Sequence, residues 1–125
     1  MSQSTNRQKI IKELDALTSL YVRKKEKKCF TCGKRLLFRK RQAGHYIARS
    51  VLATRWNTDN VHVQCAKCNV DLGGNIDQYG EKLPPETRKY LDAIYDKYKH
   101  GKLRAPSLKE MTAYRDYLKE VLEDL

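Results

Sequence analysis

Apolar residues recur at helical spacing near the start of the chain, with lysine, glutamate and aspartate between them. The recurring positions are Ile10, Ile11, Leu14, Leu17 and Tyr21. Residues three or four apart lie on one face of an α-helix. The pattern therefore predicts an amphipathic helix over about Thr5–Lys25, with one face against a core.

Two further helices are predicted after Lys82. Pro84-Pro85 suits a helix start, Gly101 suits its end, and Ser107–Glu110 forms a capping box that opens the last helix. The apolar faces comprise Leu91, Ile94, Tyr95 and Tyr98 in the first helix, and Leu108, Met111, Tyr114, Leu118, Val121, Leu122 and Leu125 in the second. We interpret these tyrosine-rich stripes as core or dimer surface rather than as platforms that stack on bases.

The middle of the chain has the pattern of short strands and turns. His45–Ala48 and Val61–Gln64 are predicted to be two strands of a hairpin, the second with alternating Val and polar residues. A short helix is expected near Cys68, ending at Gly73-Gly74. The predicted fold class is α+β in one domain, residues 1–125. It divides into an N-terminal helix (1–27), a small core (28–80) and two C-terminal helices (81–125).

The amino-acid composition indicates which class of partner the protein binds. With 40% hydrophobic and 33% charged residues the core must be modest, and a net charge of +11 favours a polyanionic partner, nucleic acid before membrane. Ten of the basic residues fall in Arg23–Arg41, against one acid, Glu26. Such a run is either a solvated face or a phosphate-facing surface, and its place beside a cysteine pair favours the second. No segment resembles a membrane span, and Met1–Lys12 is too polar for a secretory signal, so we expect a reducing, cytoplasmic location.

Four cysteines form two CxxC pairs, Cys29/Cys32 and Cys65/Cys68. Each pair brings two thiolates together in a turn, and two pairs can close a tetrahedral site suited to Zn²⁺. Gly33 fits the tight curvature of such a turn. A redox CxxC, a disulfide pair and an iron–sulfur cluster are the alternatives, and the duplication, the expected compartment and the basic context disfavour them.

Three residues in order lie within or directly after this cysteine frame: His45, Asn60 and Asn69. The set resembles the HNH nuclease motif in its His-Asn-Asn form, and the four cysteines resemble those of the endonuclease VII group of phage junction resolvases. The segments around Asp15, Cys29, His45, Trp56 and Cys65, and those at Cys68-Asn69 and Gly74-Asn75, resemble the NinG/Rap family of phage recombination endonucleases.

The resemblance implies a zinc-bound ββα-metal (HNH, treble-clef-like) core with His45 as general base and Asn69 as a ligand of one catalytic Mg²⁺ or Mn²⁺. A neutral histidine can take the proton of an attacking water. Asn60 is expected to pin the hairpin and to orient His45 through a hydrogen bond. Many HNH enzymes have Asp or His just before the catalytic histidine, where this chain has Gly44. We therefore expect Asn75, rather than Asp71, near the catalytic metal or the scissile phosphate.

Arginines near His45 are candidates for phosphate contacts, because a guanidinium matches phosphate oxygens. The predicted DNA-binding residues are Arg39, Lys40, Arg41, Arg49 and Arg55, although surface arginines on a basic hairpin are common. His62 is interpreted as structural or DNA-facing, and Trp56 as a core anchor.

The leading functional hypothesis is a metal-dependent endonuclease for branched recombination intermediates, such as a Holliday junction, D-loop or fork. The alternatives are a general HNH nicking or double-strand endonuclease and a noncatalytic zinc-dependent module that binds nucleic acid. A phage or prophage protein in the cytoplasm of the bacterial host is expected. A homodimer through the last two helices is a further hypothesis, because a four-way junction has approximate two-fold symmetry.

Overall fold

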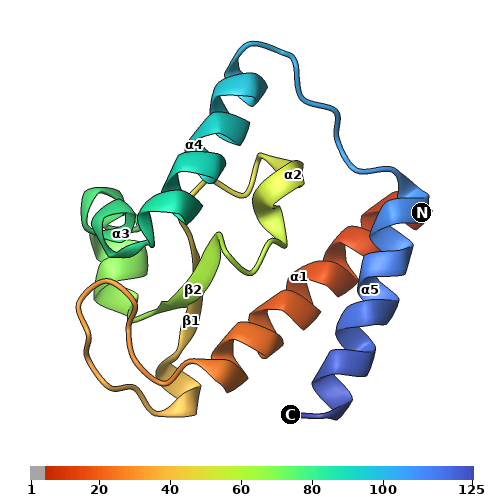
Figure 1. Ribbon diagram of the computed structural model, residues 1–125. Helices are drawn as coiled ribbons and strands as arrows, with labels where there is room; N and C mark the ends of the chain where they lie inside the picture. Colours follow the sequence, from red (N-terminus) through yellow and green to blue (C-terminus); the bar gives the residue numbers. More distant parts are fainter. Residues whose placement is uncertain (1–4) are drawn as a thin grey trace.

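The computed structural model describes residues 5–125 and has a mixed α+β architecture with one small antiparallel sheet (Figure 1). In chain order, the elements are α1 (Asn6–Lys25), η1 (Phe38–Lys40), β1 (Gln42–His45), α2 (Leu52–Arg55), β2 (Val61–Gln64), η2 (Lys67–Asp71), α3 (Ile76–Lys82), α4 (Pro85–Lys99) and α5 (Leu108–Glu123). The predicted α+β class is confirmed. No helix within residues 5–125 is long and apolar enough to cross a membrane.

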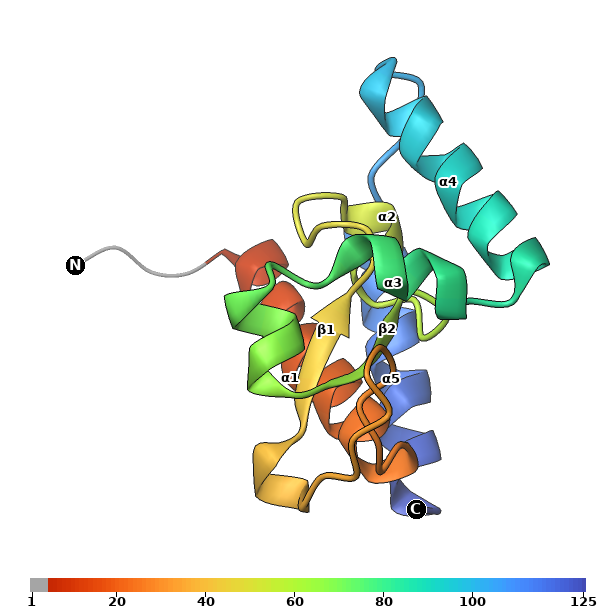
Figure 2. The ribbon, with the colours of Figure 1, turned by 90° about the vertical axis from the view of Figure 1, so that its left-hand side faces the viewer.

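Helix α1 is the central element, because it lies between α5 and the β1–β2 hairpin (Figures 1 and 2). It begins at a capping box between Thr5 and Gln8, close to the predicted start. Ile10 and Leu14 are buried with Trp56, Met111 and Leu118. The apolar stripe of α5 is therefore largely used within the chain, and only its ends, such as Leu108 and Leu125, stay exposed.

The hairpin pairs β1 with β2 in antiparallel register, with Gln42 opposite Gln64 and His45 opposite Val61. The prediction for β2 is confirmed. The prediction of a strand at His45–Ala48 is wrong, because β1 ends where the prediction had it begin. The buried side chain of Asn60 bonds both the N–H and the C=O of Ile47, so Ile47 does not continue the ladder between the strands.

The segment after Cys68 is not a continuous helix. One π-helical turn, η2, ends before Gly73, Gly74 and Asn75, whose φ angles of 58°, 94° and 50° are all left-handed. These three residues separate η2 from α3. The interruption that Gly73-Gly74 suggested in the sequence is therefore present.

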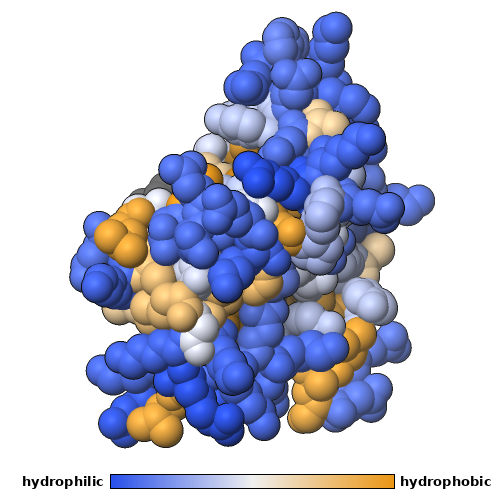
Figure 3. Space-filling model, turned by 60° about the vertical axis from the view of Figure 1, so that its left-hand side comes forward, coloured by the Kyte–Doolittle hydropathy of each residue, from blue (hydrophilic) through white to orange (hydrophobic). Residues whose placement is uncertain are grey.

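Helix α4 projects from the core and is anchored at its N-terminal half (Figure 2). Leu91 is fully buried, in a cluster with Ile47, Val51, Tyr79 and Leu83. Tyr95 and Tyr98, predicted on the same apolar face, are exposed. The surface that includes α4 is mostly hydrophilic, and its hydrophobic side chains form small separate groups (Figure 3).

Candidate functional site

The four cysteines converge on one point below the hairpin. Their sulfur atoms all lie within 4.8 Å of one another, and the Sγ atoms of Cys32 and Cys65 are 3.8 Å apart. Tetrahedral zinc with Zn–S bonds of ~2.3 Å places its sulfurs about 3.8 Å apart. None of the four is in a disulfide, and the cluster therefore fits a zinc site.

Local backbone geometry explains how the cysteines are presented. Gly33, with φ of 80°, closes the first turn, and its N–H donates to the carbonyl of Cys29. In the second pair, the N–H of Cys68 donates to the sulfur of Cys65 at 3.5 Å. Burial raises the pKa of the Cys29 thiol, but hydrogen bonds from Thr31 and from backbone amides outweigh it and bring the pKa to about 6. A thiolate is the form that binds metal.

His45 lies at the C-terminal end of β1, between two pockets. Its Nε2 is 2.8 Å from the backbone carbonyl oxygen of Arg55, which can only accept a hydrogen bond. In the neutral ring Nε2 therefore carries the proton and Nδ1 carries the lone pair. Burial lowers the pKa of His45 below its ordinary value near 6.5; the bond to the Arg55 carbonyl and the charge of Asp15 act in the opposite direction but do not cancel it. The ring is thus a neutral base at physiological pH.

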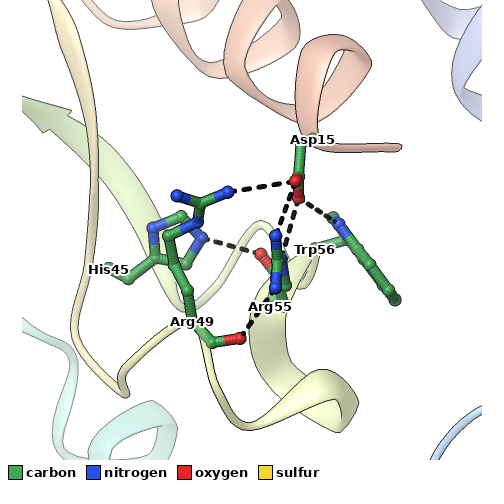
Figure 4. Close-up of polar contacts among 5 residues, drawn as sticks. All are labelled: Asp15, His45, Arg49, Arg55 and Trp56. Carbon is green, nitrogen blue, oxygen red and sulfur yellow. Dashed lines mark hydrogen bonds and ion pairs between the residues drawn. The ribbon is translucent and has the colours of Figure 1, made fainter. Parts of the chain in front are cut away.

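Asp15 of α1 holds the segment that contacts His45 (Figure 4). Its carboxylate accepts two hydrogen bonds from Arg55, at 2.7 and 2.9 Å, one from Arg49 at 3.0 Å and one from the indole N–H of Trp56 at 2.8 Å. Burial raises the pKa of Asp15, but these bonds and the two positive charges outweigh it, so the pKa lies below the ordinary 3.8.

The network also engages Arg55, which was predicted to contact DNA. Its side chain is only 18% exposed and is paired with Asp15, so it contributes to the scaffold behind His45, and its role in DNA contact stays a prediction. Arg49 is 59% exposed and shares only one nitrogen with Asp15, so it retains donors for a ligand. Sequence reasoning missed Asp15 as a functional residue, since it lies 40 positions before Arg55.

Asn60 is fully buried in the hairpin, but no hydrogen bond between its side chain and His45 is found within residues 5–125. Its side chain bonds the backbone of Ile47 and the carbonyl of Thr54. It thereby ties together the two ends of the loop that carries Arg55. The hydrogen bond that His45 makes goes to the Arg55 carbonyl, which accepts from Nε2, and no such bond joins His45 to the Asn60 side chain within residues 5–125.

Asn69, in η2, lines the same pocket as His45. This pocket of about 620 Å³ lies between the hairpin, η2 and α4, and Asp92 of α4 also lines it. The amide of Asn69 donates to Gln42 at 2.9 Å, and no hydrogen bond to its carbonyl oxygen is found within residues 5–125. Amide and carboxylate oxygens are the donors that Mg²⁺ takes. Asn69 and Asp92 thus place an amide oxygen and a carboxylate on the wall of this pocket.

Gly44 has a packing reason to lack a side chain. A Cβ atom there would lie 1.9 Å from Oε1 of Gln64, which is fully buried. The Gln64 amide is fixed by hydrogen bonds to Thr31 and to the Gly74 carbonyl. The carboxamide of Gln64 thus occupies the space that a side chain at position 44 would need.

Asn75 lies elsewhere than predicted. Its amide is 3.7 Å from the sulfur of Cys68, and it lines a pocket with the cysteines rather than the pocket of His45 and Asn69. The left-handed backbone at Gly73–Asn75 directs the chain to this side. Asp71 is exposed at the end of η2. Neither residue lines the pocket of Asn69, so the expected replacement ligand is not found at these positions.

Of the remaining predicted residues, some have side chains exposed to solvent and others are held by contacts within the chain. Arg39 and Lys40 are exposed on η1, whereas Arg41 donates to the carbonyls of Leu36 and Arg23. His62 stacks on Phe30 and bonds Glu26 at 2.8 Å, which is a structural arrangement. Trp56 is buried, as predicted for a core anchor.

Comparisons with known proteins place this chain in a family. A search of curated proteins and a search of solved structures each found no match. The family model described as Bacteriophage Lambda NinG protein matches residues 2–124, nearly the whole chain. The chain therefore belongs to the family of the bacteriophage lambda NinG protein.

Proposed function

We propose that this protein is a metal-dependent DNA endonuclease in which His45 is the general base. The observation that carries the proposal is the hydrogen bond from His45 Nε2 to the Arg55 carbonyl, which leaves Nδ1 as the basic atom of a half-buried, neutral ring. A base with this tautomer and a lowered pKa suits the removal of a proton from water. A purely nucleic-acid-binding module has no need for such a group.

The residues of the chain have separate tasks in the proposed reaction. Nδ1 of His45 takes the proton of the water that attacks the phosphorus atom, and its charge is then stabilised by the Arg55 carbonyl. Asn69 and Asp92, which line the same pocket, would hold the divalent cation. When bound, that cation supplies charge compensation to the scissile phosphate and the departing oxygen.

Asp15 and Asn60 are proposed to position the base through their bonds to the segment around Arg55 rather than through hydrogen bonds to His45 itself. Asp15 fixes the side chains of Arg55 and Trp56, and Asn60 fixes the carbonyl of Thr54, the residue before Arg55. The carbonyl that selects the His45 tautomer is therefore held from both sides. This arrangement supports a catalytic role for His45, because a surface histidine needs no such support.

We further propose that the hairpin, η2 and the cysteine site form a ββα-metal core of the HNH type. Supporting features are the position of His45 at the end of the first strand, the position of Asn69 in the helical turn after the second, and the sulfur cluster beside them. Zinc bound there is assigned a structural role, because four sulfur ligands leave no open position for a substrate.

DNA is the proposed substrate because of the net charge of +11 and the basic residues near His45. Branched recombination intermediates are preferred among DNAs on the resemblance to phage recombination endonucleases. A general HNH endonuclease remains the alternative. Action in the host cytoplasm and a homodimer are part of the same proposal, and exposed Tyr95 and Tyr98 of α4 are available for a dimer contact.

A cleavage panel tests this function. Zinc-loaded wild type and the zinc-loaded His45→Ala variant are each incubated with Mg²⁺ or Mn²⁺. The DNA substrates, of matched sequence, are a linear duplex, a fork, a D-loop and a four-way junction. The proposal expects metal-dependent cleavage, strongest on branched DNA and lost in His45→Ala. Binding without cleavage by wild type under all conditions would favour the noncatalytic module, and equal cleavage of linear and branched DNA would favour the general nuclease.

A further inference from the structure

A second pocket lies on the other side of His45, between α1 and the hairpin. Its volume is about 390 Å³, within the size range of about 300–1,000 Å³ that is typical of small-ligand sites. His45, Ala43 and Arg49 line both this pocket and the pocket of Asn69. A group bound here would therefore adjoin the proposed cleavage site without occupying it.

The pocket has an excess of positive charge. Four arginines line it, namely Arg23, Arg41, Arg49 and Arg55, against one acid, Asp15. Asp15 is committed to Arg55 and Arg49. Within residues 5–125, neither Arg23 nor Arg41 has an ion pair with an acidic side chain.

Arg23 and Arg41 are nevertheless held close together. Both guanidinium groups lie over the ring of Phe38, at 5.2 and 5.6 Å, and Arg41 donates to the backbone carbonyl of Arg23. Only Nε of Arg23 and Nε and one terminal nitrogen of Arg41 are bonded within the described chain. Two like charges that contact the same ring and keep unused donors favour an anion that both can reach.

The hydroxyl of Thr18 gives an independent indication that a ligand group binds in this pocket. It lines the pocket, is 2% exposed, and its hydroxyl has no hydrogen-bond partner within the described chain. Buried hydroxyls are normally bonded, because leaving one unpaired costs free energy. A phosphate oxygen entering the pocket would be such a partner.

We infer that this pocket binds a phosphate of the DNA backbone next to the scissile one, with Arg23, Arg41 and Arg49 as its cationic ligands. The inference rests on the proposed function in that it takes DNA as the substrate. In this arrangement the pocket of Asn69 receives the DNA at the cleavage point. The arginines near α1 bind the DNA strand beyond that point.

The test measures DNA affinity against salt in the His45→Ala background, so that cleavage does not interfere. Arg23→Gln should lower the affinity and reduce the slope of log K against log salt by about 0.9, the value for one lost phosphate contact on duplex DNA. Arg23→Lys, which retains the charge, should keep most of the slope. Lys109→Gln on α5, an exposed change of equal charge far from the pocket, should leave the slope unchanged.

Inorganic phosphate is the second probe. Titrating it into zinc-loaded protein should shift the NMR signals of the Arg23 and Arg41 side chains in wild type, and DNA should compete with it. The inference is overturned if Arg23→Gln binds DNA with the wild-type slope, or if neither phosphate nor DNA perturbs these signals. A slope loss in the His45→Ala background together with no cleavage by the wild type would support the pocket and refute the nuclease. Cleavage by the wild type together with an unchanged slope would do the reverse.

Discussion

Replacing Asp15 with asparagine should weaken both the fold and the proposed base. The substitution keeps the size of the side chain but removes the charge that accepts two bonds from Arg55 and one each from Arg49 and Trp56. An asparagine oxygen can keep one or two of these bonds, and its NH₂ group faces donors.

The decrease in the free energy of unfolding depends on which of these hydrogen bonds are shielded from water. Hydrogen bonds to charged groups contribute about 1.5–3 kcal/mol each. The bond to exposed Arg49 is discounted, because water screens it. The paired bonds of Arg55 and the bond of Trp56 are partly shielded, and losing about half of them should cost ~2–3 kcal/mol. At roughly 4 °C per kcal/mol for a domain of this size, the melting temperature should fall by about 10 °C.

The stabilisation also has a definite pH dependence. Because the pKa of Asp15 is lower in the folded state than its ordinary value of 3.8, its contribution is fully present above about pH 4 and is lost as the pH falls through the folded-state pKa. Wild type and Asp15→Asn should therefore differ in urea denaturation at pH 7 and converge in strong acid.

The pH profile of cleavage separates a positioning role from a merely structural one. The negative charge of Asp15 raises the pKa of His45, so its removal should lower that pKa further and move the acidic limb of kcat/KM to lower pH. The maximal kcat should fall while KM changes little. Glu13→Gln is the matched control, since Glu13 lies on the same helix but pairs with Arg115 of α5. A wild-type pH profile with a wild-type melting temperature in Asp15→Asn would refute the reasoning.

Four other changes test separate parts of the structure. Cys68→Ser should leave most of the protein unfolded, because a structural zinc site contributes on the order of 10 kcal/mol against a net stability of ~5–15 kcal/mol; metal analysis that finds no zinc in folded wild type contradicts this. His45→Ala should reduce cleavage ~10²–10⁴-fold and bind DNA within a few-fold of wild type, so an alanine variant that cuts normally removes His45 from the mechanism. Gly44→Ala should cost about 2 kcal/mol or more, because the new methyl group displaces the buried Gln64 carboxamide; thermal melting at the wild-type temperature would show that Gln64 moves freely. Asn75→Ala should speed zinc loss to a chelator without changing the Mg²⁺ dependence of cleavage, and an increased Mg²⁺ requirement would return Asn75 to the catalytic metal.

Local signals in the sequence predicted the parts of the molecule that depend on neighbours along the chain. The apolar spacing from Ile10 to Tyr21 predicted α1, the Val alternation predicted β2, and the paired CxxC spacing predicted the sulfur cluster. Each of these rests on periodicity or on a turn of a few residues.

The contacts that position His45 depend on residues far apart in the chain, and these the sequence could not reveal. The pairing of Asp15 with Arg55 and the hydrogen bonds of Asn60 to Ile47, beyond the end of β1, have no periodic pattern. The left-handed run Gly73–Asn75 likewise decides which side Asn75 faces, and only its two glycines hinted at it. Residue types at the candidate site were therefore readable, but their partners were not.

The tight contact between Gly44 and Gln64 links the evolution of these two positions. An aspartate or histidine at position 44 would have to displace the Gln64 carboxamide, which already fills its place. A smaller residue at position 64 would make room, but that step alone opens a void and removes the bonds to Thr31 and to the Gly74 carbonyl. Relatives with an acidic residue before the histidine should therefore carry a short side chain at the position of Gln64, and the two residues should change together across the family.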